Sequence, residues 1–228
     1  MTTTNPITQS DTLAELAIRL PGASRVFARH NLDFCCHGQI SLMEACRKKE
    51  LDADALIAEI EAEQPRDEVF ERWDQRPLSE VIEHVIERFH EPHREELPRL
   101  CGMAARVEKV HGDKASCPNG LAALLRQLSA ELHLHMEKEE NILFPMISNG
   151  RGAAATAPIQ VMEQEHEDAG AQLEQIRALT NDHTPPEEAC GTWRALYLGL
   201  AEFERDLMKH VHLENYVLFP RALRSDRP

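Results

Sequence analysis

The sequence contains two copies of a histidine–glutamate pair, each followed by an apolar run that ends in proline. The copies are His135-x3-Glu139 with Ile142-Leu143-Phe144-Pro145 and His210-x3-Glu214 with Val217-Leu218-Phe219-Pro220. Residues four apart lie on one face of an α-helix, about 6 Å apart, so such a pair can hold a metal ion. Two further histidines, His90 and His166, precede the pairs by 45 and 44 residues. The sequence therefore predicts two similar helical hairpins, related by an approximate two-fold.

The spacing of a helix-bundle seam places these polar residues among apolar ones. Each helix has a predicted row of core-facing residues that includes one or two of these side chains. In the helices with the His-x3-Glu pairs the rows are Leu132, His135, Glu139, Ile142 and Met146, and Leu207, His210, Glu214 and Val217. In the other two helices they are Ile82, Ile86 and His90, and Met162, His166 and Ala169. A buried carboxylate without a partner is costly, so two glutamates and four histidines in one core need a compensating charge. A metal centre is the simplest compensation.

The number and type of these side chains indicate how many metal ions bind and which metal is favoured. A single zinc site uses about four protein ligands, whereas six ligands with two carboxylates available as bridges favour a dinuclear site. Imidazole and carboxylate without thiolate favour iron over manganese or zinc. Glu131 and Glu165 flank the proposed ligands, and we interpret them as solvent-exposed glutamates in preference to residues that support the site.

A second ligand set matches the same helices. Glu87-x2-His90 and Glu163-x2-His166 fit the pattern of ferritin-like carboxylate bundles, with Glu139 and Glu214 as the other glutamate ligands. This set leaves His135 and His210 buried without a role, and it places Glu87 and Glu163 one residue outside the seam. We therefore favour the set built on the two His-x3-Glu pairs.

Four long amphipathic segments carry these residues. They cover about 78–111, 118–148, 158–180 and 186–219, and short breaks rich in Gly, Pro, Asn and Ser separate them. Such segments predict an all-α fold with an antiparallel four-helix bundle over 77–228. Pro92 is expected to kink the first helix near His90.

The N-terminal part differs from the bundle in the length of its helices. Short helical segments predict a small separate module over 1–65, and 66–76 is the predicted linker. The module contains Asp33-Phe34-Cys35-Cys36-His37-Gly38. Adjacent cysteines form a strained disulfide, so Cys35 and Cys36 are candidate redox thiols that can be oxidised, nitrosated or shared with a partner. The alternative is a pair of buried cysteines that act as small apolar residues.

Composition excludes several classes of protein. The chain has 228 residues, a formal net charge of −14, 42% hydrophobic and 28% charged residues, which is typical of a globular protein. No run of Lys and Arg suits a phosphate backbone, so we expect no nucleic-acid partner. Apolar runs fall short of the roughly 18 residues that span a bilayer, and the first residues lack a leader pattern. We expect no membrane partner and a cytoplasmic protein with its six cysteines reduced.

The combined motifs resemble the hemerythrin-like di-iron proteins, and more closely the repair-of-iron-centres family of iron-sulfur cluster repair proteins. The resemblance covers nearly the whole chain and rests on four groups of residues. These are the Cys35-Cys36 module, Phe89-His90-Glu91-Pro92-His93-Arg94-Glu95, Glu165-His166-Glu167, and the two His-x3-Glu pairs with their Leu-Phe-Pro endings. It implies a hemerythrin-like bundle with His90, His135, Glu139, His166, His210 and Glu214 as iron ligands. It also implies two non-haem iron ions in an Fe–O–Fe type centre, bridged by Glu139 and Glu214.

The same resemblance implies a function. We expect a stress-response protein that supports repair of iron-sulfur clusters damaged by oxidative or nitrosative stress, by iron donation or by handling NO. The expected partners are iron-sulfur proteins as clients, the gases NO and O2, and a second copy in a homodimer. Oxygen-carrying hemerythrins have a second histidine where this chain has Gly170, so an open position on the metal is expected. A gas-binding or sensing protein and a di-iron NO or O2 reductase remain alternatives, and whether the protein is an enzyme stays open.

Overall fold

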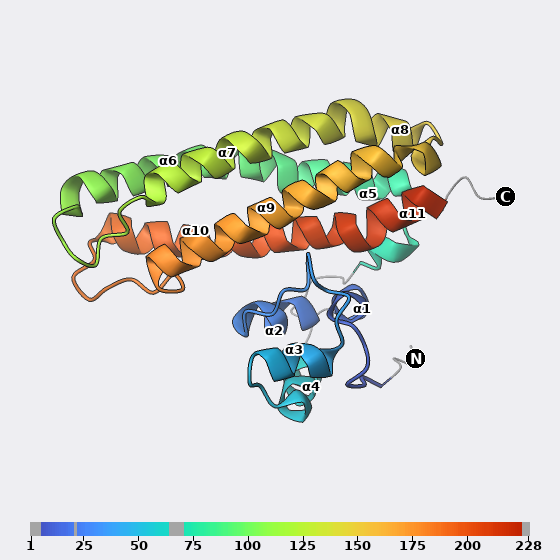
Figure 1. The fold of residues 1–228 in the computed structure, drawn as a ribbon, viewed down its shortest axis with the longest axis horizontal. Helices are drawn as coiled ribbons and strands as arrows, with labels where there is room; N and C mark the ends of the chain where they lie inside the picture. The colour runs from blue at the N-terminus through green and yellow to red at the C-terminus, as the bar shows by residue number, and fades with distance from the viewer. Residues whose placement is uncertain (1–5, 21, 64–70, 225–228) are drawn as a thin grey trace.

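A computed structural model describes residues 6–20, 22–63 and 71–224. Within these ranges the structure contains helices and no β-strand, which confirms the predicted all-α class. The N-terminal helices are α1 (Leu13–Arg19), α2 (Ala23–Arg29), α3 (Leu42–Lys48) and α4 (Ala53–Ala62). They lie together on one side of a bundle of four long rods (Figure 1). No helix in the described part of the chain is long and apolar enough to cross a membrane.

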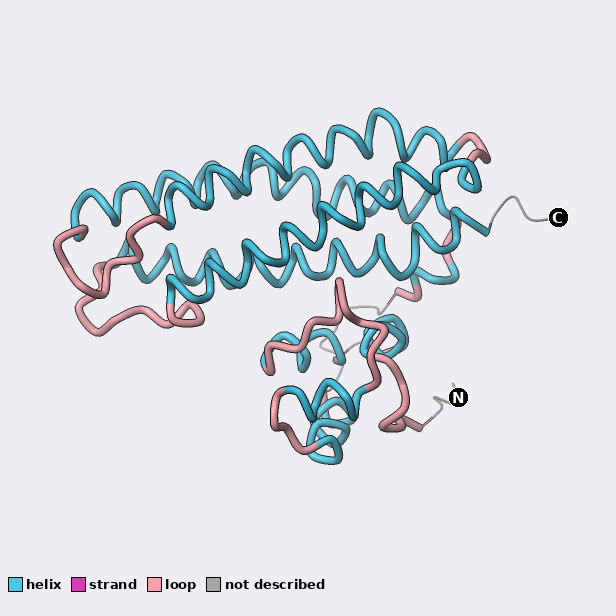
Figure 2. Tube along the Cα trace, viewed as in Figure 1, coloured by secondary structure: helices cyan, strands magenta, loops and turns pink. Residues whose placement is uncertain are grey.

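Each rod of the bundle corresponds to one predicted helical segment. The first rod is α5 (Leu78–Val85), η2 (Ile86–His90) and α6 (Glu91–His111); the second is α7 (Leu121–Lys138), η3 (Glu139–Leu143) and α8 (Phe144–Ser148); the third is α9 (Thr156–Thr180); the fourth is α10 (Gly191–Leu213), η5 (Glu214–Leu218) and α11 (Phe219–Arg224). Two 3₁₀ turns, η1 (Trp73–Gln75) and η4 (Gly152–Ala155), precede the first and third rods. Neighbouring rods run antiparallel and are joined at their ends by loops (Figure 2).

Three of the rods contain a π-helical turn of five residues, namely η2, η3 and η5. A proline follows each turn two residues later: Pro92, Pro145 and Pro220. Proline has no N–H and its ring crowds the carbonyl four residues earlier, so an α-helix cannot pass through it unchanged. A π turn accommodates one extra residue without ending the helix. A π turn over Ile86–His90 therefore lies where the sequence predicted a kink near His90.

The π turns shift which residues face the core. Ile142 was expected in the seam but its side chain is 54% exposed, whereas its neighbour Leu143 is buried. In the same rod Met146 is only half-buried and Ile147 is buried. The predicted seam after Glu139 is therefore wrong by one residue, because a five-residue turn advances the buried face by one position. The same shift leaves Ile86 half-buried.

The apolar core of the bundle consists of two clusters with a polar layer between them. One cluster joins α6, α7, α9 and α10 with the small helices α1 to α4, and includes Phe27, Leu125 and Trp193. The other joins α5 and α8 with the first part of α9 and the end of the fourth rod, and includes Phe89 and Phe219. In every rod the break between the clusters coincides with the histidines and glutamates singled out in the sequence.

Candidate metal centre

All six predicted ligands lie in this polar layer, and all six are buried. They are His90 on the first rod, His135 and Glu139 on the second, His166 on the third, and His210 and Glu214 on the fourth. The competing residues Glu87 and Glu163 are exposed and do not join them. The structure thus brings together the His-x3-Glu set and not the ferritin-like set.

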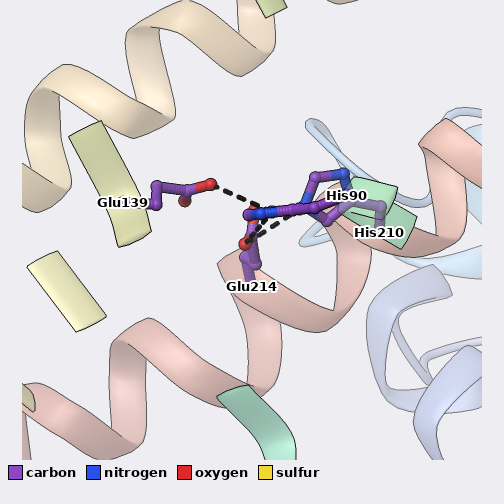
Figure 3. A group of neighbouring side chains, drawn as sticks. All are labelled: His90, Glu139, His210 and Glu214. Atoms are coloured by element: carbon purple, nitrogen blue, oxygen red, sulfur yellow. Dashed lines mark hydrogen bonds and ion pairs between the residues drawn. The ribbon is translucent and has the colours of Figure 1, made fainter. Parts of the chain in front are cut away.

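The six residues form two groups that share both glutamates. One group is His90, Glu139, His210 and Glu214, shown in Figure 3, and the other is His135, Glu139, His166 and Glu214. Within each group one nitrogen or oxygen atom per residue lies within 4.8 Å of the others. In both groups the two histidines come from different hairpins, so each group combines residues of three rods.

The distances between potential ligand atoms match those around a metal ion. Two atoms bonded to one ion at about 2.1 Å, at angles between about 90° and 109°, lie about 3.0 to 3.4 Å apart. The Nε2 atoms of His90 and His210 are 3.0 Å apart, and those of His135 and His166 are 3.1 Å apart. The closest Nε2-to-carboxylate distances for the four histidines are 3.4, 3.2, 3.3 and 3.1 Å for His90, His210, His135 and His166.

Three of the histidines have their other ring nitrogen, Nδ1, fixed by a hydrogen-bond acceptor. His90 Nδ1 donates to Glu140 at 2.7 Å, His135 Nδ1 to Glu165 at 3.0 Å and His166 Nδ1 to the amide oxygen of Asn215 at 2.8 Å. A proton on Nδ1 leaves the Nε2 lone pair free for a metal. His135 and His166 both have Nδ1 fixed in this way, and their Nε2 lone pairs, which face each other at 3.1 Å, repel unless a cation lies between them.

These acceptors were only partly visible in the sequence. Glu165 was interpreted as a solvent-exposed glutamate, and this was wrong, since it accepts from His135 and also pairs with Lys138. Glu140 and Asn215 were missed, although each directly follows the glutamate of its His-x3-Glu pair. Because the two pairs are repeats, this shared position was the signal that identifies both.

The internal symmetry fails at one histidine. The residue before His166 is Glu165, and the residue before His90 is Phe89. Phe89 stacks on His210 with a ring-centroid distance of 5.4 Å, and the buried Nδ1 of His210 has no hydrogen-bond partner. The centre therefore has one polar acceptor fewer than a perfect repeat would give it: a carboxylate holds His135, whereas an aromatic ring packs on its counterpart His210.

Burial determines the charges of the groups in the absence of a metal. It lowers the pKa of His90 to about 2 and that of His135 to about 4, so both imidazoles are neutral, which is the form that binds metals. Burial and the adjacent Glu214 carboxylate raise the pKa of Glu139 well above its usual range. The four carboxylate oxygens of Glu139 and Glu214 have no hydrogen-bond donor. A bound cation supplies the charge that these oxygens lack.

The thiol loop, residues 31–41 between α2 and α3, reaches the bundle (Figure 2). It lies near the centre, because Asn215 bonds to both His166 and the loop. Three side chains of the fourth rod bind its backbone carbonyls: His212 donates to Phe34 O at 3.1 Å, Asn215 to Cys35 O at 3.0 Å and Tyr216 to Cys36 O at 2.8 Å. The two cysteines are free thiols, with Cys35 buried and Cys36 half-buried. They lie outside the six-residue cluster, and their redox role stays a prediction.

A small cavity leads from the surface toward the centre. It has a volume of about 210 Å³, and its lining includes His135, His166 and His210 as well as the leucines Leu128, Leu132 and Leu207. Gly170, where oxygen-carrying hemerythrins have a histidine, faces the thiol loop, since a Cβ built there would lie 3.8 Å from Cys36 Sγ. The cavity gives a small uncharged molecule a route toward the histidines.

Comparison with known proteins agrees with this architecture. The family described as "Hemerythrin HHE cation binding domain" matches residues 81–222, and a "Domain of Unknown function (DUF542)" matches residues 9–64. The chain is 52% identical over 218 residues to an iron-sulfur cluster repair protein, YtfE, of Yersinia pseudotuberculosis serotype O:1b, and equally to YtfE of Yersinia pestis strain Pestoides F. Both alignments cover 96% of this chain and 99% of the relative. The donor set of four imidazoles and two carboxylates fits non-haem iron.

Proposed function

This chain belongs to the hemerythrin HHE family and, within it, to the iron-sulfur cluster repair proteins, and from this premise we propose that it supports repair of damaged iron-sulfur clusters with a di-iron centre. His90, His135, Glu139, His166, His210 and Glu214 hold the two ions, and Glu139 and Glu214 bridge them. The observation that carries the proposal is the pair of facing imidazoles on each side of two shared, donor-free carboxylates. Iron-sulfur proteins are the clients, and the cytoplasmic location and the homodimer stay predictions.

The chain's own residues prepare the centre for iron. Glu140, Glu165 and Asn215 hold Nδ1 protons and so direct Nε2 lone pairs inward. Burial keeps His90 and His135 neutral and ready to bind. When bound, iron of this type supplies Lewis-acid and one-electron redox chemistry to small molecules. None of these six residues is a cysteine, so iron held by them would differ chemically from the thiolate-bound iron of a cluster.

The proposal is tested by cluster repair in vitro. The iron-loaded full chain is incubated with a client enzyme whose cluster has been damaged by NO, and activity is compared with that restored by the same amount of free iron salt. We expect about two iron ions per chain and greater recovery than with free iron. His135→Ala removes a ligand and should abolish both, whereas His133→Ala changes an exposed histidine two residues away and should leave both intact. Recovery equal to that with free iron would refute the repair function.

A second candidate function is favoured by the cavity. It reaches His135, His166 and His210 between leucines and a set of charged side chains, and its size suits a small gas such as NO or O2. A reductase acting on either gas would sustain turnover with an electron donor, whereas a sensor would bind the gas reversibly and a repair protein would lose iron to clients. Steady turnover by the iron-loaded protein, lost in His135→Ala and kept in His133→Ala, would support the reductase.

A further inference from the structure

The thiol loop contains a second group of potential metal ligands, separate from the bundle centre. One ligand atom each of Asp33, Cys35 and Cys36 lies within 4.8 Å of the other two. The Sγ atoms of Cys35 and Cys36 are 3.8 Å apart, and Cys35 Sγ is 3.3 Å from Asp33 Oδ1. Cys35 is only 7% exposed, so its thiol is held in a protein environment and not in solvent.

These spacings fit a tetrahedral ion. Two thiolate sulfurs bound at about 2.3 Å to a tetrahedral ion lie about 3.8 Å apart, and a sulfur and a carboxylate oxygen on it lie about 3.6 Å apart. The observed sulfur–sulfur distance equals the first value, and the sulfur–oxygen distance is within 0.3 Å of the second. A vicinal disulfide would need the two sulfurs at about 2.05 Å instead.

The loop is held in this shape without the ion. Asp33 Oδ1 accepts hydrogen bonds from the backbone N–H groups of Cys35 and Cys36 at 3.1 and 2.9 Å. Its second oxygen, Oδ2, is 2.6 Å from Nδ1 of His37, which orients the carboxylate. Tyr216 fixes the end of the loop, accepting from Gly38 N and donating to Cys36 O, each at 2.8 Å. The three ligands therefore lose little further freedom on binding an ion.

The group opens into a pocket that leaves room for a fourth ligand. The pocket has a volume of about 360 Å³, and its lining includes Asp33, Cys35 and Cys36. Its charged walls are Lys48, Lys49 and Arg177 together with Glu167 and Glu174. A divalent ion with two thiolates and one carboxylate carries one net negative charge, and the wall around it has three cations against two carboxylates.

We propose that Asp33, Cys35 and Cys36 form a second metal site for a thiolate-preferring divalent cation such as Zn²⁺ or Fe²⁺, with its fourth position open to the pocket. On binding, the two S–H bonds break, both protons pass to solvent, and two sulfur–metal bonds form with no change in oxidation state. Thiolates select such cations, whereas the imidazoles and carboxylates of the bundle do not discriminate in this way. The site stands on residues outside the bundle centre and does not depend on the proposed repair function.

Cobalt(II) distinguishes the two sites, because only thiolate ligands give sulfur-to-cobalt charge-transfer absorption. Co²⁺ is titrated into the iron-loaded full chain, with its thiols kept reduced and oxygen excluded. We expect one Co²⁺ per chain to bind with this absorption. The double variant Cys35→Ser, Cys36→Ser should lose the band, and the matched variant Cys101→Ser, Cys190→Ser should retain it, since both of those cysteines lie outside the site.

Two further variants separate the site from folding and from the bundle. Asp33→Asn keeps an oxygen for the two backbone N–H groups but removes the charge, and should weaken Co²⁺ binding at least tenfold while circular dichroism and iron content stay unchanged. His135→Ala, which removes a bundle ligand, should leave the thiolate band intact. Absence of the band in the unmodified protein, or its persistence in the double Cys35, Cys36 variant, would overturn the proposal.

Discussion

His166 donates from Nδ1 to the amide oxygen of Asn215 at 2.8 Å, and this bond links the metal centre to the thiol loop. The direction is fixed because Asn215 uses its Nδ2 to donate to the carbonyl of Cys35 at 3.0 Å. One side chain of the fourth rod thus orients a predicted iron ligand and holds the backbone of a predicted thiol. Cys36 Sγ lies 3.7 Å from the backbone carbonyl of the same histidine.

Asn215→Ala removes the acceptor that fixes the Nδ1 proton of His166. We expect about 10- to 100-fold weaker iron binding, because a free imidazole must be reoriented before it binds. Competition with a chelator measures this change. Asn141→Ala is the control, since Asn141 is exposed and bonds only to the carbonyl of Glu137 in its own helix. Equal affinities of the two variants would show that Asn215 does not orient the ligand.

Glu139→Gln separates metal binding from folding. In the metal-free protein burial raises the pKa of Glu139 well above its usual range, which favours the protonated carboxyl group, and this form resembles the glutamine amide. The variant should therefore keep the melting temperature of the metal-free protein but lose most of its iron, because the amide cannot supply a bridging charge. Iron content and thermal unfolding of both metal-free proteins are the measurements. The exposed residue Glu87, changed to Gln, should retain full iron content.

The sequence was sufficient to predict the bundle and the six side chains that meet in it. Two features made this prediction possible. The His-x3-Glu pairs repeat at matching separations along the sequence, and two buried carboxylates need a compensating charge, for which a metal ion is the simplest source. The family comparison confirms the hemerythrin-like fold. The residues that support the histidines were harder to identify, since their partners come from other rods: Glu165 of the third rod accepts from His135 of the second.

The register beyond the ligands could not be predicted with a constant helical period. Extrapolating 3.6 residues per turn past Glu139 selects Ile142, whereas the π turn buries Leu143. Proline two residues after each π turn is the local cause, and its repetition at Pro92, Pro145 and Pro220 was present in the sequence. No local sequence pattern predicted the contact between the thiol loop and the fourth rod, because Cys35 and Asn215 are 180 residues apart in the sequence.

The register shift predicts a large loss of stability at one residue and almost none at its neighbour. Leu143→Ala should lower the free energy of unfolding by about 2 to 5 kcal/mol, because it empties a fully packed position. Ile142→Ala, at a site 54% exposed, should change it by less than about 0.5 kcal/mol. Urea unfolding of the metal-free variants measures both. A larger loss for Ile142→Ala than for Leu143→Ala would mean that the α-helical register continues through this turn.

The metal-free protein should lose stability as the pH falls below about 6.5. Burial lowers the pKa of His90 and His93 to about 2 and that of His135 and His212 to about 4, whereas the pKa of histidine in the unfolded chain is about 6.5. Below that pH the unfolded chain binds protons that the folded chain does not, so unfolding becomes easier. Above about pH 6.5 the histidines are neutral in both states, and the protein keeps its full free energy of unfolding. As the pH falls, the contribution that depends on His135 and His212 decreases, and it is lost by about pH 4.

Each such histidine lowers the free energy of unfolding by up to about 1.4 kcal/mol per pH unit as the pH falls through this window. Glu139 acts in the opposite direction, because burial raises its pKa. Four histidines outweigh one carboxyl group, so the slope keeps its sign. Urea unfolding between about pH 7 and about pH 5 measures it, and His133→Ala, at an exposed histidine, should leave it unchanged. A free energy of unfolding that is constant or rises as the pH is lowered would show that these imidazoles are protonated in the folded protein.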